Sequence, residues 1–150
     1  MGKINIIDVR SKKNVIKICE VHNRIPQKWD RAYKLKDDYI KESIKRFQES
    51  LNNNRLFCRA VFKSDKIISY IWAEITKSDE DIVNIVSLWT KKKYRNRGFA
   101  QKLKKQLHSW AKKRGCKRIL TQVNPKNRNM LNLNKKMDYT KTWIKMEKKL

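Results

Sequence analysis

The spacing of apolar and polar residues changes several times along the first half of the chain. The run Lys3–Val9 is short and rich in β-branched residues, which predicts a strand. From Ser11, a typical N-cap residue, to His22 the apolar positions recur at helical spacing. A loop or broken helix is expected over 23–34, and a second apolar stripe predicts a helix over Ile40–Leu51.

The middle of the chain is typical of strands joined by tight turns. Three β-branched and aromatic runs, separated by short polar turns, are expected to form an antiparallel meander. They are Leu56–Phe62, Ile67–Thr76 and Ile82–Thr90. The basic segment 91–98 follows the last run, and we expect it to be a loop.

The last third returns to helical spacing twice. A helix is expected over Phe99–Arg114 and another over Asn127–Met137. Strands are expected over Arg118–Val123 and Tyr139–Lys148. The order β-α-α-β-β-β-α-β-α-β predicts an α+β, or mixed α/β, fold with antiparallel strands first and a βαβ crossover later.

Length and composition narrow the class of protein further. The chain has 150 residues and 39% hydrophobic content, enough for one core, so a single domain over 1–150 is expected. No apolar run of 18 residues and no signal-peptide pattern occurs, which favours a cytoplasmic protein with no membrane contact. The scattered Cys19, Cys58 and Cys116 indicate reduced thiols packed as small hydrophobes, with no metal site.

The net charge of +25, from 39 Lys and Arg against 14 Asp and Glu, indicates an anionic partner. A basic nucleic-acid-binding protein is one hypothesis. Against it, the lysines are spread over every predicted helix and loop, and aromatic residues are not interleaved with them as stacking platforms would require.

One loop carries candidate chemistry. The sequence Arg95-x-x-Gly98-x-Ala100 lies between a predicted strand and an amphipathic helix. Free backbone N–H groups and the helix dipole make such a helix start an anion site, and glycine allows a ligand close to the backbone. A diphosphate would suit this site, although a solvated basic turn would show the same residues.

A second motif favours the first interpretation. Asn127, Met130, Leu133 and Tyr139 stand at the spacing of a family pattern, and with the Arg95–Ala100 motif the chain resembles the GNAT superfamily of acetyl-coenzyme A dependent N-acetyltransferases. The resemblance covers nearly the whole chain. It implies a central mixed, mostly antiparallel sheet of six or seven strands flanked by four helices.

The resemblance also implies which residues bind acetyl-CoA, which the enzyme uses as substrate without a metal. The end of the fourth strand would pair with the pantetheine arm, the loop and helix start would wrap the pyrophosphate, and one asparagine would hydrogen-bond the cofactor. These residues are Leu88, Trp89, Thr90, Arg95, Asn96, Arg97, Gly98, Phe99, Ala100 and Asn127. Lys135 and Lys136 could meet a phosphate, but a solvated helix face is the simpler interpretation.

The sequence departs from the family at its acid and base positions. Asn84 and Gln122 stand where members often carry a base, and Asn134 replaces the tyrosine that protonates the leaving thiolate. An amide cannot accept a proton from an ammonium group at neutral pH. Glu74, acting through water, is the candidate base, with an outward-facing strand residue as the alternative.

Other proton-transfer candidates are weaker. Tyr94 and Tyr139 are remote candidates for the acid that protonates the thiolate. The alternative is that no protein acid is needed, because a thiol pKa of about 8–9 makes the thiolate a tolerable leaving group. We expect His22 to cap the first helix beside the loop 23–34, which the resemblance places at the acceptor pocket, and His108 to face solvent.

The sequence therefore predicts an acetyl-CoA-dependent N-acetyltransferase in which an amine attacks the thioester directly. The positive surface favours an anionic acceptor, such as an acidic protein, an aminoacyl-RNA or a small anionic amine, over polycations. A GNAT-fold module that binds acetyl-CoA without efficient catalysis is the alternative, and the sequence leaves a homodimer open.

Overall fold

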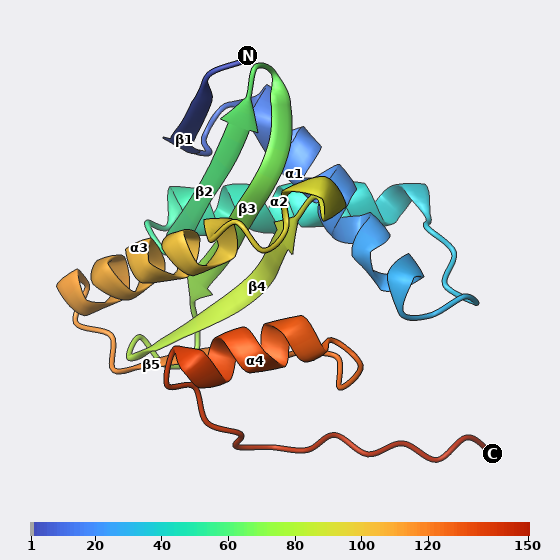
Figure 1. The fold of residues 1–150 in the computed structure, drawn as a ribbon. Coiled ribbons are helices and arrows are strands. Elements are labelled where there is room, and N and C mark those ends of the chain that lie inside the picture. Colours follow the sequence, from blue (N-terminus) through green and yellow to red (C-terminus); the bar gives the residue numbers. More distant parts are fainter. Residues whose placement is uncertain (1) are drawn as a thin grey trace.

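The computed structural model describes residues 2–150, and within them five strands form one sheet in the order β1-β2-β3-β4-β5 (Figure 1). The first four strands are antiparallel neighbours, and β5 runs parallel to β4. The strands are β1 (Ile4–Asp8), β2 (Leu56–Lys63), β3 (Lys66–Ile75), β4 (Ile82–Thr90) and β5 (Arg118–Thr121).

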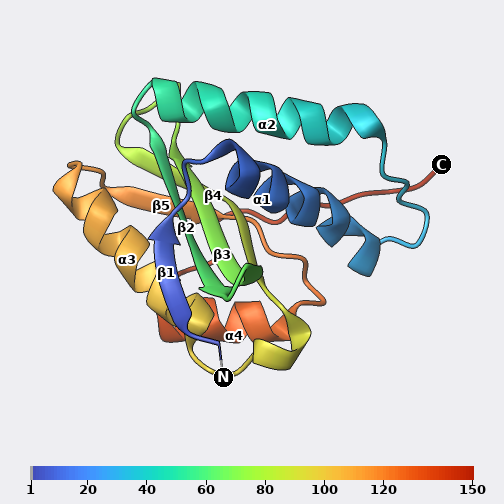
Figure 2. The same ribbon diagram turned by 90° about the horizontal axis from the view of Figure 1, so that it is seen from above.

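Helices cover both faces of this sheet. Figure 2 shows α1 and α2 on one side and α3 and α4 on the other. The helices are α1 (Lys12–Arg24), α2 (Asp37–Asn52), α3 (Phe99–Lys113) and α4 (Arg128–Lys136), with short 3-10 turns η1 (Ile25–Lys28) and η2 (Lys92–Tyr94). No helix among residues 2–150 combines the length and apolarity that a membrane crossing requires.

The side chains of β3 alternate between the two faces of the sheet and contribute to the core on each face. Ile71 packs with Leu103 and Leu107 of α3, while its neighbour Trp72 packs with Phe47 of α2 on the opposite face. These five side chains are fully buried, and each such burial stabilises the fold by about 1.5–3 kcal/mol. The two faces of one strand therefore fix the positions of α2 and α3.

The predicted fold class and element order are confirmed up to residue 136. The broken helix expected over 23–34 is α1 followed directly by η1, where Pro26 stands in the first turn. The loop expected over 91–98 contains the turn η2.

The expected number of strands is wrong for the described residues. The segment Tyr139–Lys148 forms no strand, so the sheet has five strands and not six or seven. Its alternating sequence suits a strand, but a strand also needs a neighbouring edge to complete its hydrogen bonds, and this segment leaves α4 without joining one (Figure 1).

Two irregularities of β4 leave the end of this strand unpaired on one side. A β-bulge places Val86 between the pairs Trp72↔Ser87 and Ala73↔Ile85. On its other side β4 pairs with β5 only over Ile82–Ile85. Beyond Ile85 the two parallel strands separate, and the β5 side of β4 is open.

Candidate functional site

A cavity of about 680 Å³ lies where β4 and β5 separate. It is bordered by the end of α1, the turn η1, the end of β4, the start of α3 and one face of α4. Its lining consists of Val21, Arg24, Ile25, Lys28, Trp29, Leu88, Trp89, Thr90, Tyr94, Arg95, Asn96, Gly98, Phe99, Ala100, Gln101, Asn127, Asn129, Met130, Leu133 and Lys136.

The end of β4 gives the cavity a strand edge. Leu88, Trp89 and Thr90 pair with β3 on one side and have no β5 partner on the other. The hydroxyl of Ser69 donates to the Trp89 carbonyl at 3.0 Å, and Tyr70 shares a 2.7 Å hydrogen bond with Ser87. An extended, amide-containing ligand could hydrogen-bond this rigid edge as a further strand would.

The start of α3 gives the cavity an anion site. Gly98 has a left-handed φ of 82°, no side chain caps the helix, and a Cβ placed on this glycine would meet nothing within 4 Å. The backbone N–H groups of the first helical turn therefore face open space, with the positive end of the helix dipole behind them. Arg95 is fixed nearby because its Nε donates to the Thr90 carbonyl at 3.0 Å.

Of the residues predicted to bind the cofactor, only Arg97 is absent from the cavity lining. It is exposed, and its guanidinium carbon lies 5.4 Å from the centre of the Tyr94 ring. Asn127 does line the cavity and is also the N-cap of α4, where its Oδ1 accepts from the Met130 N–H at 3.2 Å. The Nδ2 group of Asn127 is therefore the part that a ligand could contact.

Three residues that the sequence did not single out also line the cavity. Arg24, Lys28 and Trp29 reach it from the end of α1, from η1 and from the residue after η1. Burial lowers the pKa of Lys28 from its usual value, and the charges of Arg95 and Lys92 lower it further. The resemblance implies that the loop 23–34 borders the acceptor pocket, but it does not name the residues that do so.

The charge of the cavity has one sign. Its lining includes Arg24, Lys28, Arg95 and Lys136, and it includes no Asp, Glu or His. Lys135, the other candidate on α4, is exposed and outside the lining. Like charges that gather without a carboxylate raise one another's energy, so this cavity suits a ligand that brings its own phosphates.

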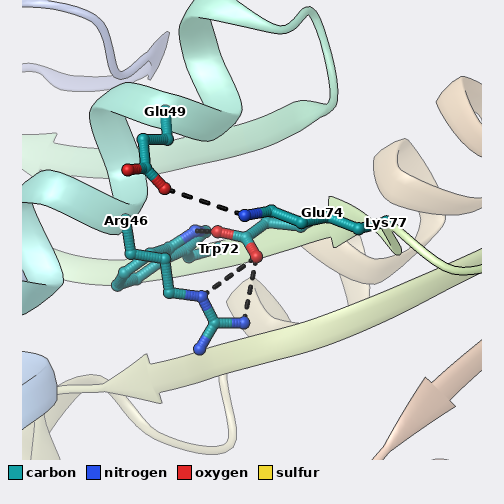
Figure 3. Close-up of polar contacts among 5 residues, drawn as sticks. All are labelled: Arg46, Glu49, Trp72, Glu74 and Lys77. Carbon is teal, nitrogen blue, oxygen red and sulfur yellow. Dashed lines mark hydrogen bonds and ion pairs between the residues drawn. The ribbon is translucent and has the colours of Figure 1, made fainter.

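Glu74, the predicted base, does not line this cavity. Figure 3 shows its carboxylate held by one residue of α2 and one of β3: Oε2 accepts from Arg46 Nε at 3.1 Å and from Nη2 at 2.9 Å, and Oε1 accepts from Trp72 Nε1 at 3.1 Å. A second ion pair, Lys77 with Glu49 at 3.8 Å, lies beside it. Glu74 is buried, not outward-facing. Because both of its oxygens accept hydrogen bonds from protein side chains, a structural role fits these contacts better than the role of a base.

The three amides at the family's acid and base positions also lie outside the cavity lining. Asn84 stands directly across from Glu74 on the neighbouring strand, and Gln122 is exposed beyond the end of β5. Asn134 is buried, and its Oδ1 accepts from Lys104 Nζ at 2.8 Å.

Both histidines differ from expectation. His22 lies inside α1, edge-on to Trp72 at 5.3 Å between ring centres, and its buried Nδ1 has no hydrogen-bond partner among the described residues, so it is not a cap. Burial lowers its pKa, and so does Arg46. His108 is not simply solvent-facing, because its Nε2 shares a 2.8 Å hydrogen bond with the Tyr139 hydroxyl. Tyr139, unlike Tyr94, does not line the cavity.

The cysteines and other possible metal ligands form no further site within residues 2–150. Cys19 and Cys58 are buried, Cys116 is partly buried, and all three are free thiols. No three His, Cys, Asp or Glu side chains of this part of the chain gather closely enough to hold a metal ion.

Solved structures share this fold over nearly the whole chain. A predicted acetyltransferase from Clostridium acetobutylicum, solved with acetyl-CoA, superposes with a TM-score of 0.77 at 20% identity, over 97% of this chain and 96% of that one. An acetyl transferase candidate from Pyrococcus furiosus gives 0.74 at 21% identity, over 99% and 100%. AAC(6')-Iy in complex with the bisubstrate analogue CoA-S-monomethyl-acetylneamine gives 0.68 at 14% identity, over 99% of each chain.

Sequence comparison gives the family. No curated protein matches the chain in a sequence search. The model of the acetyltransferase (GNAT) family matches residues 18–139, which include the second half of α1, the sheet from β2 to β5, the Arg95–Ala100 loop and α4. The chain therefore belongs to the GNAT family of acetyltransferases.

Proposed function

We propose that this acetyltransferase moves the acetyl group of acetyl-CoA to a primary amine, and that the cavity between β4, α3 and α4 binds acetyl-CoA. One observation carries the proposal: the open edge of β4 and the uncapped start of α3 border the same cation-lined cavity. An extended amide chain and a diphosphate, the two parts of coenzyme A, each have a matching surface there.

The residues divide this task by position. Leu88 and Thr90 offer backbone hydrogen bonds to the pantetheine arm, whereas the Trp89 carbonyl is already bonded to Ser69 on the β3 side. The N–H groups that follow Gly98 bind the diphosphate, and Arg95 and Lys28 add charge from either side. The amide of Asn127 contacts the arm from α4. These contacts orient the cofactor before the acceptor arrives.

Acetyl-CoA supplies a thioester, whose carbonyl carbon an uncharged amine can attack. The C–S bond then breaks and coenzyme A leaves as a thiolate, which takes up through water the proton that the acylated nitrogen loses. The chain contributes chiefly position and backbone electrostatics, because the cavity lining contains no carboxylate or imidazole to take the proton of an ammonium group. The acceptor amine therefore loses its proton to water. With this mechanism kcat/KM rises with pH until the pKa of the acceptor amine is reached.

The acceptor is an amine that also carries negative charge. The cavity presents Arg24, Lys28, Arg95 and Lys136, whose charge the phosphates of coenzyme A largely balance, but the chain as a whole carries a net charge of +25. The acetylneamine part of the analogue bound to AAC(6')-Iy derives from an aminoglycoside, a polycation. Such an acceptor would be repelled here, whereas a small anionic amine, an acidic protein or an aminoacyl-RNA would be attracted.

A matched pair of glycine variants tests the cofactor site. Gly98 and Gly115 both have positive φ, 82° and 77°, and at both positions an added Cβ meets nothing within 4 Å. Alanine at either position should therefore cost a similar ~1 kcal/mol of backbone strain. Only Gly98→Ala places a methyl group in front of the α3 N–H groups, so calorimetry should show at least tenfold weaker binding of coenzyme A for this variant alone. Equal affinities of the two variants for coenzyme A would show that the diphosphate does not bind at the start of α3.

An acceptor panel tests the reaction. Thiol release from acetyl-CoA should be faster with anionic amines, acidic peptides or aminoacyl-RNA than with spermine or an aminoglycoside. Faster turnover of spermine would contradict the acceptor class and leave the cofactor site intact. Tight binding of acetyl-CoA with no turnover of any amine would instead identify a binding module. This alternative is favoured by Asn84, Gln122 and Asn134, which stand where family members often carry an acid or a base.

A further inference from the structure

Helix α4 forms one wall of the cavity but belongs to neither apolar core. Its N-cap and four residues of the helix line the cavity: Asn127, Asn129, Met130, Leu133 and Lys136. The two buried apolar clusters within residues 2–150, and the partly buried side chains packed against them, include no residue of α4. Packing in these clusters fixes α1, α2 and α3, so α4 needs another attachment.

The attachment of α4 is polar and comes from α3. Asn134 is the residue of α4 that is buried, and its Oδ1 accepts from Lys104 Nζ at 2.8 Å. The same Nζ lies 4.0 Å from the centre of the Tyr139 ring, as in a cation–π contact. The Tyr139 N–H donates to the Asn134 carbonyl at 2.9 Å, and its hydroxyl shares a 2.8 Å hydrogen bond with His108 Nε2. We call these four residues the anchor of α4.

Lys104 is an unfavourable residue at this place if stability alone is considered. It is fully buried, and no carboxylate pairs with it among the ion pairs of the described residues. Burial of an ammonium group opposite a neutral amide costs free energy that an apolar side chain of similar length would avoid. Lys104 also does not line the cavity, so it does not touch a ligand there. Its contacts to α4 are what it contributes.

We propose that Lys104 is a positioning residue, which fixes α4 against α3 through Asn134 and Tyr139 and thereby sets the affinity of the cavity for coenzyme A. Without this donor the buried Oδ1 of Asn134 would have no partner. Asn134 would then have to reach water, and the end of α4 would move away from α3 together with Leu133 and Lys136. The link to affinity rests on the proposed function, whereas the attachment of α4 does not.

The variant Lys104→Met separates positioning from stability. Methionine keeps most of the length and apolar contact of lysine and removes the donor and the charge. The free energy of unfolding at pH 7 should be no lower than in the wild type, because the penalty for burying the ammonium group disappears with it. Calorimetry should nevertheless show at least tenfold weaker binding of coenzyme A. The KM for acetyl-CoA should rise, while kcat at saturation should change less than threefold.

Two further changes supply the controls. Lys105→Met removes one positive charge from the exposed neighbour of Lys104 on the same helix and should leave coenzyme A binding within twofold. Asn134→Asp keeps an acceptor for the Lys104 ammonium group and should bind coenzyme A within threefold of the wild type, whereas Asn134→Leu removes the acceptor and should bind at least tenfold more weakly. The double variant K104M/N134L should bind no more weakly than N134L alone, because the two side chains act through each other.

Hydrogen exchange without cofactor reports the position of α4 directly. In Lys104→Met the amides of residues 131–137 should exchange at least tenfold faster, and those of α3 should be unchanged. Unchanged exchange of these amides, or a loss of affinity matched by an equal loss of stability, would overturn the proposal. So would unchanged coenzyme A binding in Lys104→Met if Gly98→Ala weakens that binding. If neither variant weakens it, the proposed cofactor site is wrong, and faster exchange of residues 131–137 would still confirm the attachment of α4.

Discussion

The contacts of Glu74 determine what its replacement should do. Its carboxylate accepts hydrogen bonds from Arg46 and Trp72 and lies outside the cavity lining. The change Glu74→Gln keeps the shape and removes the charge, so the free energy of unfolding should fall by about 1 kcal/mol, while kcat with a good acceptor should change less than threefold. Urea unfolding and steady-state kinetics measure the two effects. A loss of 100-fold in kcat without lost stability would restore Glu74 as the base.

Lys104 is a second buried charge with consequences for stability. It is fully buried on α3, where Asn134 accepts its hydrogen bond and no carboxylate is its partner in any ion pair of the described residues. Burial lowers its pKa from 10.5 to about 8. Between these pH values the unfolded chain binds more protons than the folded chain, so the contribution of Lys104 to the free energy of unfolding rises with pH.

The variant Lys104→Met isolates this effect. The difference in unfolding free energy, wild type minus variant, should rise by about 1.4 kcal/mol per pH unit from pH 8.5 to 10 and should be flat below pH 7.5. Other groups, such as the buried thiols and tyrosines, titrate in both proteins and largely cancel in the difference. Urea unfolding at several pH values measures it. A flat difference across this range would mean that Lys104 keeps an ordinary pKa.

Among the elements, the turn η1 contributes a cavity residue that the sequence did not single out. It carries Lys28 into the cavity, whereas the neighbouring Gln27 is exposed and outside the lining. Lys28→Gln and Gln27→Glu each change the net charge by one unit. We expect Lys28→Gln to weaken coenzyme A binding three- to tenfold at low salt and Gln27→Glu to change it less than twofold. Equal effects of the two changes would show that coenzyme A binding depends on the overall electrostatic field of the protein and not on Lys28 itself.

The elements also show where prediction from sequence succeeds and fails. The helices, the strands β1 to β5 and the loop before α3 were predictable because their signals are local in the sequence. These signals are the periodicity of apolar residues, the N-cap Ser11, and the turn residues Gly98 and Pro26. The ion pair of Glu74 with Arg46, the place of Lys28 and the missing sixth strand depend on residues distant in sequence. The alternation over Tyr139–Lys148 suits a strand, but it does not show that a sheet edge is available to complete one.

On the scale of the whole molecule, the charge of +25 has two opposite consequences. It attracts anions such as coenzyme A to the cation-lined cavity, and it repels a second copy of the same chain. Both effects act over a distance that salt controls, since the Debye length shortens from about 30 Å at 0.01 M to about 8 Å at 0.15 M.

Salt should therefore weaken coenzyme A binding. From 0.01 M to 0.15 M salt, the dissociation constant should rise because screening reduces the attraction of coenzyme A to Lys28, Arg95 and their neighbours. Calorimetry at several salt concentrations measures this constant, and light scattering on the same samples checks that the mass of the protein stays the same. A dissociation constant that does not change over this range would mean that the cations of the cavity lining do not contact the phosphates of coenzyme A.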